Sequence, residues 1–330
     1  MLNNKVILIT GGTGSFGQAF TEIIFEKYKP KKVIVFSRDE FKQHEMAKKF
    51  PTKKYNIRFF IGDIRDKDRL ERAFDGIDYV VHAAALKQVP ALEYNPMEAV
   101  KTNVLGANNI VEAAIDKGVK MVIALSTDKA VNPVNLYGAT KLVSEKIFID
   151  ANAYGGGRTK FSVVRYGNVV GSRGSVVEHF MDLKHRNISE FPITDKKMTR
   201  FWMTTDQSVQ LVIKAIKETV GGEIFVPKIS SMNIMDLVRA INPKCTFRAI
   251  GIRAGEKMHE ILVSEDESSR TKIFDGIYVI LPQFFEKREA HRKYKRYRSL
   301  PANFAYKSDD NKDWLTIKEL QNILKACTNI

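Results

Sequence analysis

The chain has 330 residues, of which 44% are hydrophobic and 28% are charged, which excludes a disordered or collagen-like polypeptide and predicts one large or two unequal globular domains. Lysine and arginine number 53 against 38 aspartate and glutamate. The net charge of +15 makes acidic partners worth considering, such as phosphates, nucleic acid or an anionic membrane.

Cysteines, histidines and apolar runs indicate the compartment. Cys245 and Cys327 are too few for a disulfide framework or a thiolate metal cluster, which favours a reducing environment. The six histidines lack zinc-binding spacing, so no metal is expected. Because no apolar run reaches the ~20 residues of a membrane span, we predict a cytoplasmic protein with no membrane partner.

Short runs rich in valine and isoleucine recur along the first half of the chain and predict buried strands. Segments of helical periodicity lie between them, for example Phe16–Ile24 and Val104–Ile115. This alternation predicts an α/β fold, with a Rossmann-like, doubly wound parallel sheet over residues 1–170. The predicted strands are Lys5–Ile9, Lys32–Phe36, Ile57–Ile61, Tyr79–His82, Met121–Ser126 and Phe161–Tyr166.

A glycine-rich turn joins the first predicted strand to the first predicted helix. Gly11, Gly14 and Gly17 permit a tight turn, close approach of the backbone to a pyrophosphate and close packing of helix on strand. Free N–H groups at the start of the helix favour an anion. The turn therefore predicts a dinucleotide site, whose other members are Thr13, Ser15 and Phe16.

The end of the second predicted strand distinguishes NAD from NADP. A lone acidic residue at this place binds the ribose 2′-hydroxyl of NAD. Here Ser37 and Arg38 come first, and Lys42 follows one helical turn later, which suits a 2′-phosphate and favours NADP. Asp39 keeps NAD as the less favoured alternative. The residues expected beside the adenine ring are Asp63 and Ile64, a helix cap being the alternative for the aspartate.

Five residues predict a catalytic site. Tyr137 and Lys141 are four apart, so on a helix both side chains share one face. An adjacent ammonium would bring the tyrosine pKa, ordinarily ~10, towards neutral pH and make the phenolate a usable base. A preceding strand ends in Thr127, Asp128 and Lys129, where the carboxyl ends of parallel strands form a ligand crevice.

On these motifs the sequence resembles the extended short-chain dehydrogenase/reductases. Sugar-nucleotide 4-epimerases of that family need only the Ser/Thr, Tyr and Lys, whereas 4,6-dehydratases add an acid–base pair after the threonine. Here that pair is Asp128-Lys129, as in the soluble, C5-inverting UDP-N-acetylglucosamine 4,6-dehydratases, which make the first intermediate of pseudaminic acid in bacterial surface and flagellar glycosylation. The other segments that carry the resemblance are 10–17, 82–90, Asn103, 165–175, 198–201 and 251–257.

The resemblance also implies a mechanism. Tyr137, assisted by Lys141 and Thr127, would take the proton of the sugar 4-hydroxyl while hydride passes from C4 to NADP. Lys129 would remove the C5 proton as general base, provided its pKa is lowered, and a protonated Asp128 would assist departure of the 6-hydroxyl as water. Hydride then returns to C6, and reprotonation at C5 inverts that carbon.

Further contacts come from the resemblance alone. An arginine suits a diphosphate because its guanidinium engages two oxygens at once, although a surface ion pair is the alternative for each one. The substrate contacts implied are Lys87, Asn168, Arg173, Thr199, Arg253 and Glu256. The additional cofactor contacts are Ala83, Thr102 and Val169, beside Tyr137 and Lys141. Relatives form dimers through helices next to the active site, and in this branch the dimers assemble into hexamers.

The second half of the chain is less regular. We expect residues 171–330 to form a smaller substrate-binding region and a tail, with some segments returning to the sheet. Strand-like runs occur at Ile224–Val226 and Phe247–Ile252. The basic run 287–298 is interpreted as a solvated helix or loop face, and since only this run interleaves basic residues with aromatics, no nucleic-acid partner is predicted.

Two alternatives to the dehydratase remain open at this point. A 4-epimerase or reductase of the same family would need Tyr137 and Lys141 but would have no use for Asp128-Lys129. A non-catalytic NADP-binding regulator would keep the glycine turn, and the intact Thr127, Tyr137 and Lys141 argue against it.

Overall fold

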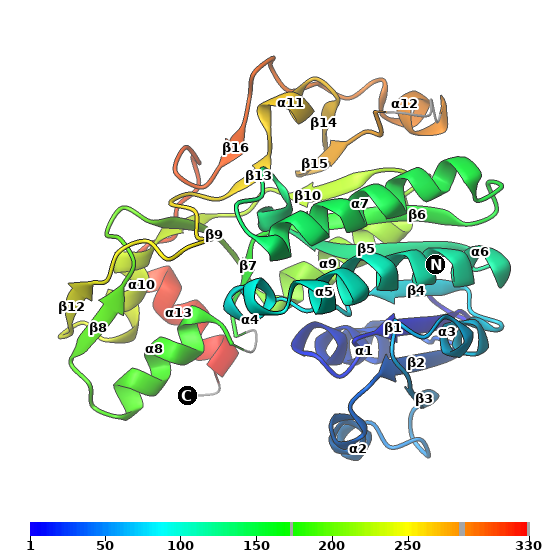
Figure 1. The fold of residues 1–330 in the computed structure, drawn as a ribbon, viewed down its shortest axis with the longest axis horizontal. Coiled ribbons are helices and arrows are strands. Elements are labelled where there is room, and N and C mark those ends of the chain that lie inside the picture. The colour runs from blue at the N-terminus through cyan, green and yellow to red at the C-terminus, as the bar shows by residue number, and fades with distance from the viewer. Residues whose placement is uncertain (172–173, 284–287, 329–330) are drawn as a thin grey trace.

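The computed structural model describes residues 1–171, 174–283 and 288–328 (Figure 1). The strands are β1 (Val6–Thr10), β2 (Lys32–Ser37), β3 (Ile57–Ile61), β4 (Tyr79–His82), β5 (Met121–Thr127), β6 (Lys160–Tyr166), β7 (Asn168–Val169), β8 (Glu190–Ile193), β9 (Thr199–Met203), β10 (Ile224–Pro227), β11 (Ser231–Asn233), β12 (Thr246–Ala249), β13 (Ile261–Val263), β14 (Thr271–Phe274), β15 (Ile277–Ile280) and β16 (Tyr306–Lys307). The helices are α1 (Ser15–Lys27), α2 (Glu40–Lys49), α3 (Lys67–Phe74), α4 (Val89–Tyr94), α5 (Pro96–Ala99), the π-helix η1 (Val100–Leu105), α6 (Gly106–Asp116), the 3₁₀-helix η2 (Asp128–Ala130), α7 (Leu136–Tyr154), α8 (Val176–His185), α9 (Thr205–Glu218), α10 (Ile234–Ile241), α11 (Glu265–Ser268), α12 (Arg288–Tyr294) and α13 (Ile317–Thr328).

Within the described residues, nine strands form one sheet in the order β14-β15-β10-β6-β5-β4-β1-β2-β3. All neighbours from β3 to β10 are parallel, and β15 and β14 continue the sheet antiparallel. The chain builds outward from β1 in one direction and from β4 in the other, so the strand order reverses between β1 and β4. The structure confirms the predicted Rossmann-like α/β class, and a ligand crevice belongs at this reversal point.

Helices cover both faces of the sheet. Phe20 of α1 and Val212 of α9 share one buried apolar cluster, whereas Val111 of α6 and Phe148 of α7 share the other. The strands between them are buried on both faces, which explains why they read as continuous apolar runs rather than as alternating ones.

The helix expected over Val104–Ile115 is interrupted. The π-helix η1 runs from Val100 to Leu105, and α6 begins only at Gly106. Within η1 the Asn103 amide accepts from the N–H of Leu86 and donates to its carbonyl, each at 2.9 Å. The wide turn thereby holds the loop after β4 at the crevice, which is a frequent use of π-helical turns.

The chain after residue 170 divides between two places. Helix α9 and strands β10, β14 and β15 return to the sheet. Helices α8, α10 and α13 pack around a separate apolar cluster that includes Phe180, Leu237 and Leu320. This smaller body lies beside the carboxyl ends of the sheet strands (Figure 1). It supplies a second wall for the crevice.

The basic run 287–298 packs more closely than expected; residue 287 lies outside the described residues. In α12, Ala290 and Tyr294 are fully buried, and the Tyr294 ring meets Phe274 edge-on at 5.2 Å between centroids. Lys293 donates to the Glu218 carboxylate at 2.9 Å and to its carbonyl, at the end of α9. The interpretation as a solvated face is wrong for this side of α12. In the described part of the chain, no helix combines the length and apolarity needed to cross a membrane.

Candidate active site

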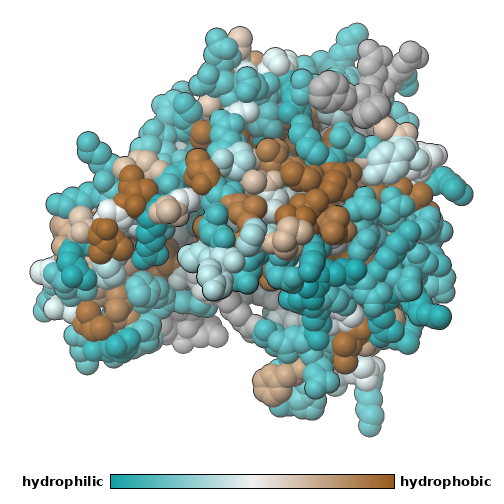
Figure 2. All heavy atoms as spheres, viewed as in Figure 1, coloured by the Kyte–Doolittle hydropathy of each residue, from teal (hydrophilic) through white to brown (hydrophobic). Residues whose placement is uncertain are grey.

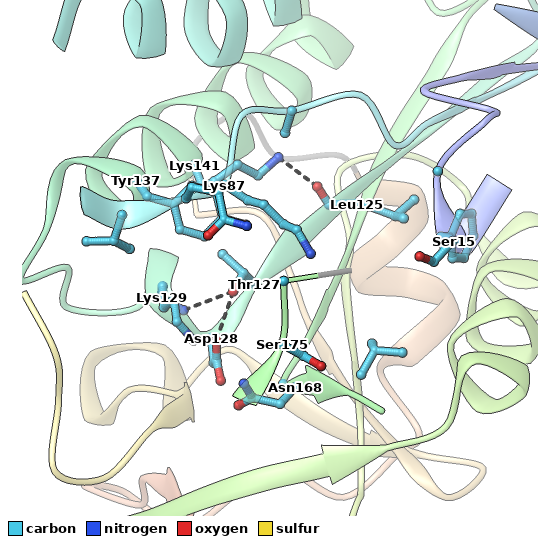
Figure 3. A pocket seen from close by; sticks show the side chains of 18 of the residues that line it. Ser15, Lys87, Leu125, Thr127, Asp128, Lys129, Tyr137, Lys141, Asn168 and Ser175 are labelled. Atoms are coloured by element: carbon cyan, nitrogen blue, oxygen red, sulfur yellow. Dashed lines mark hydrogen bonds and ion pairs between the residues drawn. The ribbon is translucent and has the colours of Figure 1, made fainter. Parts of the chain in front are cut away.

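A cavity of about 930 Å³ lies at the carboxyl ends of the parallel strands (Figure 3). Its wall includes the residues that follow β1, β2, β3, β4 and β5, together with loops from the smaller body. All the predicted catalytic and cofactor residues line it: Gly11, Thr13, Gly14, Ser15, Phe16, Gly17, Ser37, Arg38, Asp39, Lys42, Asp63, Ile64, Ala83, Thr102, Thr127, Asp128, Lys129, Tyr137, Lys141 and Val169.

The glycine turn after β1 is shaped to hold an anion. Gly11 has a φ of +65°, and a Cβ there would come within 2.9 Å of the Ala84 backbone. Gly17 leaves no room for a Cβ against the backbone of Gly12. Gly14 caps α1 without a side-chain hydrogen bond, so the first N–H groups of that helix remain available to a ligand. These residues fit the pyrophosphate of a dinucleotide.

The charged residues after β2 are already paired with one another. Lys42 lies 2.7 Å from the Asp39 carboxylate, which also caps α2 by accepting from the Lys42 N–H at 2.9 Å. These two contacts lower the pKa of Asp39. The Arg38 guanidinium lies 3.5 Å from the Asp63 carboxylate, and the Arg38 side chain is about half exposed.

The helix-cap alternative for Asp63 is wrong. The N-cap of α3 is Asp66, whose carboxylate accepts from the N–H of Arg69. Asp63 instead accepts from Arg65 at 2.8 Å and lines the cavity. Burial would raise the pKa of Asp63, but the Arg65 guanidinium outweighs burial and lowers it.

The catalytic candidates come from three neighbouring elements. Strand β5 ends at Thr127, the short helix η2 carries Asp128 and Lys129, and the first turn of α7 carries Tyr137. The Thr127 hydroxyl donates to Asp128 at 2.8 Å, and the Lys129 amine lies 3.1 Å from the same carboxylate oxygen. Gly138 leaves no room for a Cβ against the Lys129 carbonyl, so this glycine lets α7 approach η2 closely.

The tyrosine and the lysine of α7 interact differently from what their spacing predicts. Burial raises the pKa of Tyr137 to about 12, and the ammonium of Lys129 opposes the rise. The Lys141 amine donates to the Leu125 carbonyl at 2.8 Å (Figure 3). Burial lowers the pKa of Lys141 to about 8. The ammonium of Lys129 therefore favours the phenolate of Tyr137.

Lys129 lies between two carboxylates, which favour its protonated form. Burial disfavours its ammonium, but the carboxylates of Asp128 at 3.1 Å and Glu260 at 3.4 Å outweigh burial and raise the Lys129 pKa. Burial raises the pKa of Asp128, and the charge of Glu260 adds to that rise. The condition set for Lys129 as a general base, a lowered pKa, is therefore not met in the protein without substrate.

Four of the predicted substrate residues line the cavity, namely Lys87, Asn168, Arg253 and Glu256. Arg173 lies outside the described residues. Thr199 is buried behind the wall, where its hydroxyl contacts His259 at 2.8 Å and Ser308 at 2.7 Å. Contrary to the predicted substrate contact, Thr199 does not line the cavity, whereas its neighbour Arg200 does.

Comparison with known proteins identifies the family. A model of the polysaccharide biosynthesis protein family matches residues 7–282. The chain belongs to this family. The result confirms the resemblance that the motifs after β1 and β5 indicated, down to the group of relatives they pointed to.

Alignments with named relatives cover most of the chain. The chain is 51% identical over 330 residues to a UDP-N-acetylglucosamine 4,6-dehydratase (inverting) of Campylobacter jejuni, covering 98% of each protein. It is 43% identical over 291 residues to a UDP-glucose 4-epimerase of Rickettsia akari, covering 85% of this chain and 84% of that enzyme. The X-ray structure of Pen from Bacillus thuringiensis superposes with a TM-score of 0.90 at 36% identity, covering 100% of both chains.

Unpartnered polar atoms mark where a ligand of this family member would bind. In the described part of the chain, several buried side-chain atoms that lack a hydrogen-bond partner line this cavity. They belong to Thr102, Ser126, Asp128, Asn168, Ser175, Trp202, Glu256 and Glu260. A buried polar atom without a partner is costly, so the clustering indicates a polar ligand. Among the described residues, no three His, Cys, Asp or Glu side chains converge as a metal site.

Two functional candidates were missed from the sequence. Arg200 lies 3.6 Å from Glu260, and Glu260 in turn contacts Lys129. Both residues lie within or beside segments that carried the resemblance to the family, 198–201 and 251–257. Nothing local in those segments distinguished Arg200 and Glu260 from their neighbours.

Proposed function

We propose that this protein is an NADP-dependent UDP-N-acetylglucosamine 4,6-dehydratase that inverts C5. The observation that carries the proposal is the pair Asp128 and Lys129, placed directly after Thr127 and in one cavity with Tyr137 and Lys141. An acid–base pair at that place serves an elimination, which an epimerase does not perform. The Campylobacter jejuni relative named for this reaction supports the assignment.

Residues after β1 and β2 would hold the cofactor. The N–H groups at the start of α1 suit its pyrophosphate, and Arg38 is the cation available to a 2′-phosphate. Asp39 is engaged by Lys42 and by the start of α2, which weakens the case for NAD. When bound, the nicotinamide supplies reversible oxidation of the sugar at C4.

Tyr137 acts on the sugar 4-hydroxyl. As the phenolate, its oxygen accepts the proton of the sugar 4-hydroxyl while C4 is oxidised, and the Thr127 hydroxyl is the second hydrogen-bonding group for the 4-oxygen. The positive charge of Lys129 favours the phenolate form of Tyr137. Lys141, fixed to the Leu125 carbonyl, adds a second buried amine at the same end of β5.

Asp128 and Lys129 carry out the elimination. Transfer of one proton from Lys129 to Asp128 across their 3.1 Å contact leaves a neutral amine and a carboxylic acid. The amine takes the C5 proton, which the 4-ketone has made acidic, and the acid gives its proton to the departing 6-hydroxyl, which leaves as water. The pair ends as ammonium and carboxylate, in its starting form.

The test is conversion of UDP-N-acetylglucosamine by the purified protein, without added cofactor, in deuterated water, followed by NMR. We expect a 6-deoxy-4-keto sugar nucleotide that carries deuterium at C5 in the inverted configuration. Such a product is the kind of sugar nucleotide from which pseudaminic acid is made. Return of unchanged substrate would refute the proposal.

A 4-epimerase is the second candidate because of the relatives named UDP-glucose 4-epimerase at 43% identity. The same NMR experiment separates the two activities. An epimerase produces the C4 epimer, retains the 6-hydroxyl and incorporates no deuterium at C5.

Replacing Arg38 with alanine is expected to reduce the preference for NADP over NAD by about 10- to 100-fold, the effect of removing one charged hydrogen bond. Calorimetric titration of the cofactor-free protein with each dinucleotide measures it. Arg58→Ala is the matched control, because Arg58 is an exposed arginine on the neighbouring strand β3, outside the cavity. An unchanged preference in the Arg38 variant would remove Arg38 from the 2′-phosphate site.

We also infer a homodimer built through helices α4 to α7, the kind of unit from which a hexamer could assemble. Exposed apolar side chains lie along this face, among them Tyr94, Met97, Leu105 and Val143. Figure 2 shows apolar residues gathered over the same region. A patch of this kind favours association. Sedimentation velocity should give at least twice the 37.5 kDa chain mass, and Val143→Arg should lower it.

A further inference from the structure

Glu260 lies against the catalytic pair although it comes from a distant part of the chain. One oxygen of its carboxylate is 3.4 Å from the Lys129 amine and 3.6 Å from Arg200. The other oxygen has no partner among the described residues and belongs to the cavity wall. The residue is 2% exposed, so its charge acts where water screens it little.

The backbone of Glu260 is held in place independently of its side chain. Its N–H donates to the Ser308 hydroxyl, and its carbonyl accepts from the Ser308 N–H, both at 2.9 Å. The Ser308 hydroxyl also contacts Thr199 at 2.7 Å, and Thr199 contacts His259. This buried chain of polar contacts ties Glu260 to β9 and to the segment after β16, so the carboxylate has a defined position.

The charges around Lys129 come from every element that packs on it. Asp128 is its neighbour on η2, and Arg200 of β9 and Lys257 flank Glu260. The ammonium of Lys129 also lowers the pKa values of Tyr137, on α7, and of Lys87. Within this set Lys129 lies between two carboxylates, Asp128 and Glu260, at 3.1 and 3.4 Å.

We propose that Glu260 is a positioning residue that acts through Lys129: it holds the amine beside Asp128 and keeps it protonated until substrate is bound. The part of this inference that concerns turnover rests on the proposed dehydratase function. The two carboxylates play different roles, because Asp128 exchanges a proton with Lys129 whereas Glu260, paired with Arg200, stays ionised. Burial opposes that ionisation, but the positive charges of Lys129, Arg200 and Lys257 outweigh it and lower the pKa of Glu260.

The first test measures Lys129 directly, on the full chain as purified and without UDP-sugar. Trace acetylation with acetic anhydride across a pH series, read by mass spectrometry of the peptide that contains Lys129, gives the pKa of that amine. Removing an opposite charge at this distance is expected to lower it by about one to three units in Glu260→Gln. Glu260→Ala removes the same charge and serves if the glutamine variant does not fold.

The second test measures turnover. The elimination needs one proton shared by Lys129 and Asp128, so activity falls at high pH when Lys129 loses that proton to solvent. This basic limb of the kcat profile should move to lower pH in Glu260→Gln, by the same shift as the acetylation pKa. The KM for the UDP-sugar should stay within about threefold. A purely structural role would reduce the folded fraction without moving this limb.

Glu265→Gln is the matched control, because Glu265 lies on the same segment and contacts only the exposed Lys307 among the ion pairs of the described residues. An unchanged Lys129 pKa in a folded Glu260 variant would overturn the inference. Failure of the wild-type protein to convert UDP-N-acetylglucosamine would refute the proposed function instead, and the acetylation result would still stand.

Discussion

Lys129→Gln is expected to lower the rate of 6-deoxy-4-keto product formation by about 10³-fold, within the range that positioned general acid–base groups contribute. Glutamine keeps much of the length of the lysine side chain but cannot take the C5 proton. Lys129 is about one-quarter exposed and Asp128 is buried, so the change removes a reacting group without opening the core. NMR of the reaction mixture measures the rate, and calorimetric titration with UDP measures binding, which should change only a few-fold.

The control is a lysine at the other end of β5. Lys120 precedes β5 at the end opposite to the cavity, where it pairs with Asp78 on the surface at 2.7 Å. Lys120→Gln should leave the rate unchanged and cost at most about 1 kcal/mol of stability, as for exposed pairs. If the Lys129 variant turned over at the wild-type rate, the amine would have no part in the elimination.

The cofactor half of the cavity was predictable because its determinants are local. The glycine turn joins β1 to α1 without an intervening element, and its chemistry depends on backbone shape that glycine spacing encodes directly. Tyr137 and Lys141 face the same cavity because both lie in the first turns of one helix. In each case the relevant distances span only a few residues of the chain.

The residues on the proposed substrate side of the cavity could not be predicted without the fold. The prediction chose Thr199 in segment 198–201, but successive residues of a strand point to opposite faces. Arg200 and Trp202 of β9 line the cavity, whereas Thr199 is buried behind it. Only the register of β9 against β7 and β11 decides which set faces the ligand.

The charge state of Lys129 also depends on contacts distant in sequence. From its neighbours in the chain, only Asp128 could be foreseen as a partner. Glu260 comes 131 positions after Lys129 in the sequence and reaches it because Ser308 fixes the Glu260 backbone. The direction of the Lys129 pKa shift follows from the sum of both carboxylates, so the sequence alone could not decide whether the amine meets the condition for a general base.

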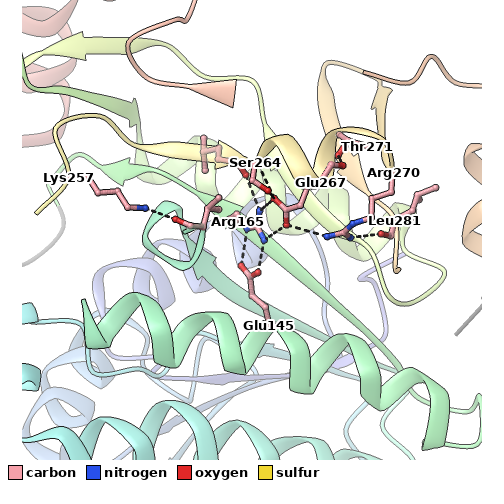
Figure 4. Close-up of polar contacts among 10 residues, drawn as sticks. Glu145, Arg165, Lys257, Ser264, Glu267, Arg270, Thr271 and Leu281 are labelled. Carbon is pink, nitrogen blue, oxygen red and sulfur yellow. Dashed lines mark hydrogen bonds and ion pairs between the residues drawn. The ribbon is translucent and has the colours of Figure 1, made fainter. Parts of the chain in front are cut away.

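A buried ion network ties the catalytic helix to the second half of the chain (Figure 4). Arg165 of β6 makes paired contacts with Glu145 of α7, at 2.6 and 3.0 Å, and with Glu267 of α11, at 2.9 and 3.0 Å. Arg165 is 1% exposed. Glu145 lies one helical turn beyond Lys141, and its charge opposes the lowering of the Lys141 pKa by burial. The network therefore fixes α7 and also influences the charge on its lysine.

Arg165→Met is expected to lower the free energy of unfolding by about 3 to 5 kcal/mol at pH 7, because it removes the cation from buried Glu145 and leaves Glu267 with only Arg270, at 3.4 Å. Urea denaturation followed by circular dichroism measures the loss. Arg186→Met is the control, since Arg186 is an exposed arginine with a surface partner, Asp182, and its replacement should cost about 1 kcal/mol or less. Equal losses in the two variants would show that the buried network contributes no more than a surface pair.

The pH dependence of the unfolding free energy provides a second, independent test of the role of Arg165. Burial opposes the charge on Glu267, but Arg165 outweighs burial and lowers the pKa of Glu267 to about 2 from an ordinary 4.5. A lowered carboxyl pKa contributes stability that is present above pH 4.5 and is lost as the pH falls towards 2. Without Arg165 that contribution is smaller, since only the Ser264 N–H and Arg270 still favour the Glu267 carboxylate. The difference in unfolding free energy between wild type and Arg165→Met should therefore narrow as the pH falls through this interval. A difference that stayed constant down to the acid limit would mean that Arg165 stabilises the protein through packing rather than through the charge of Glu267.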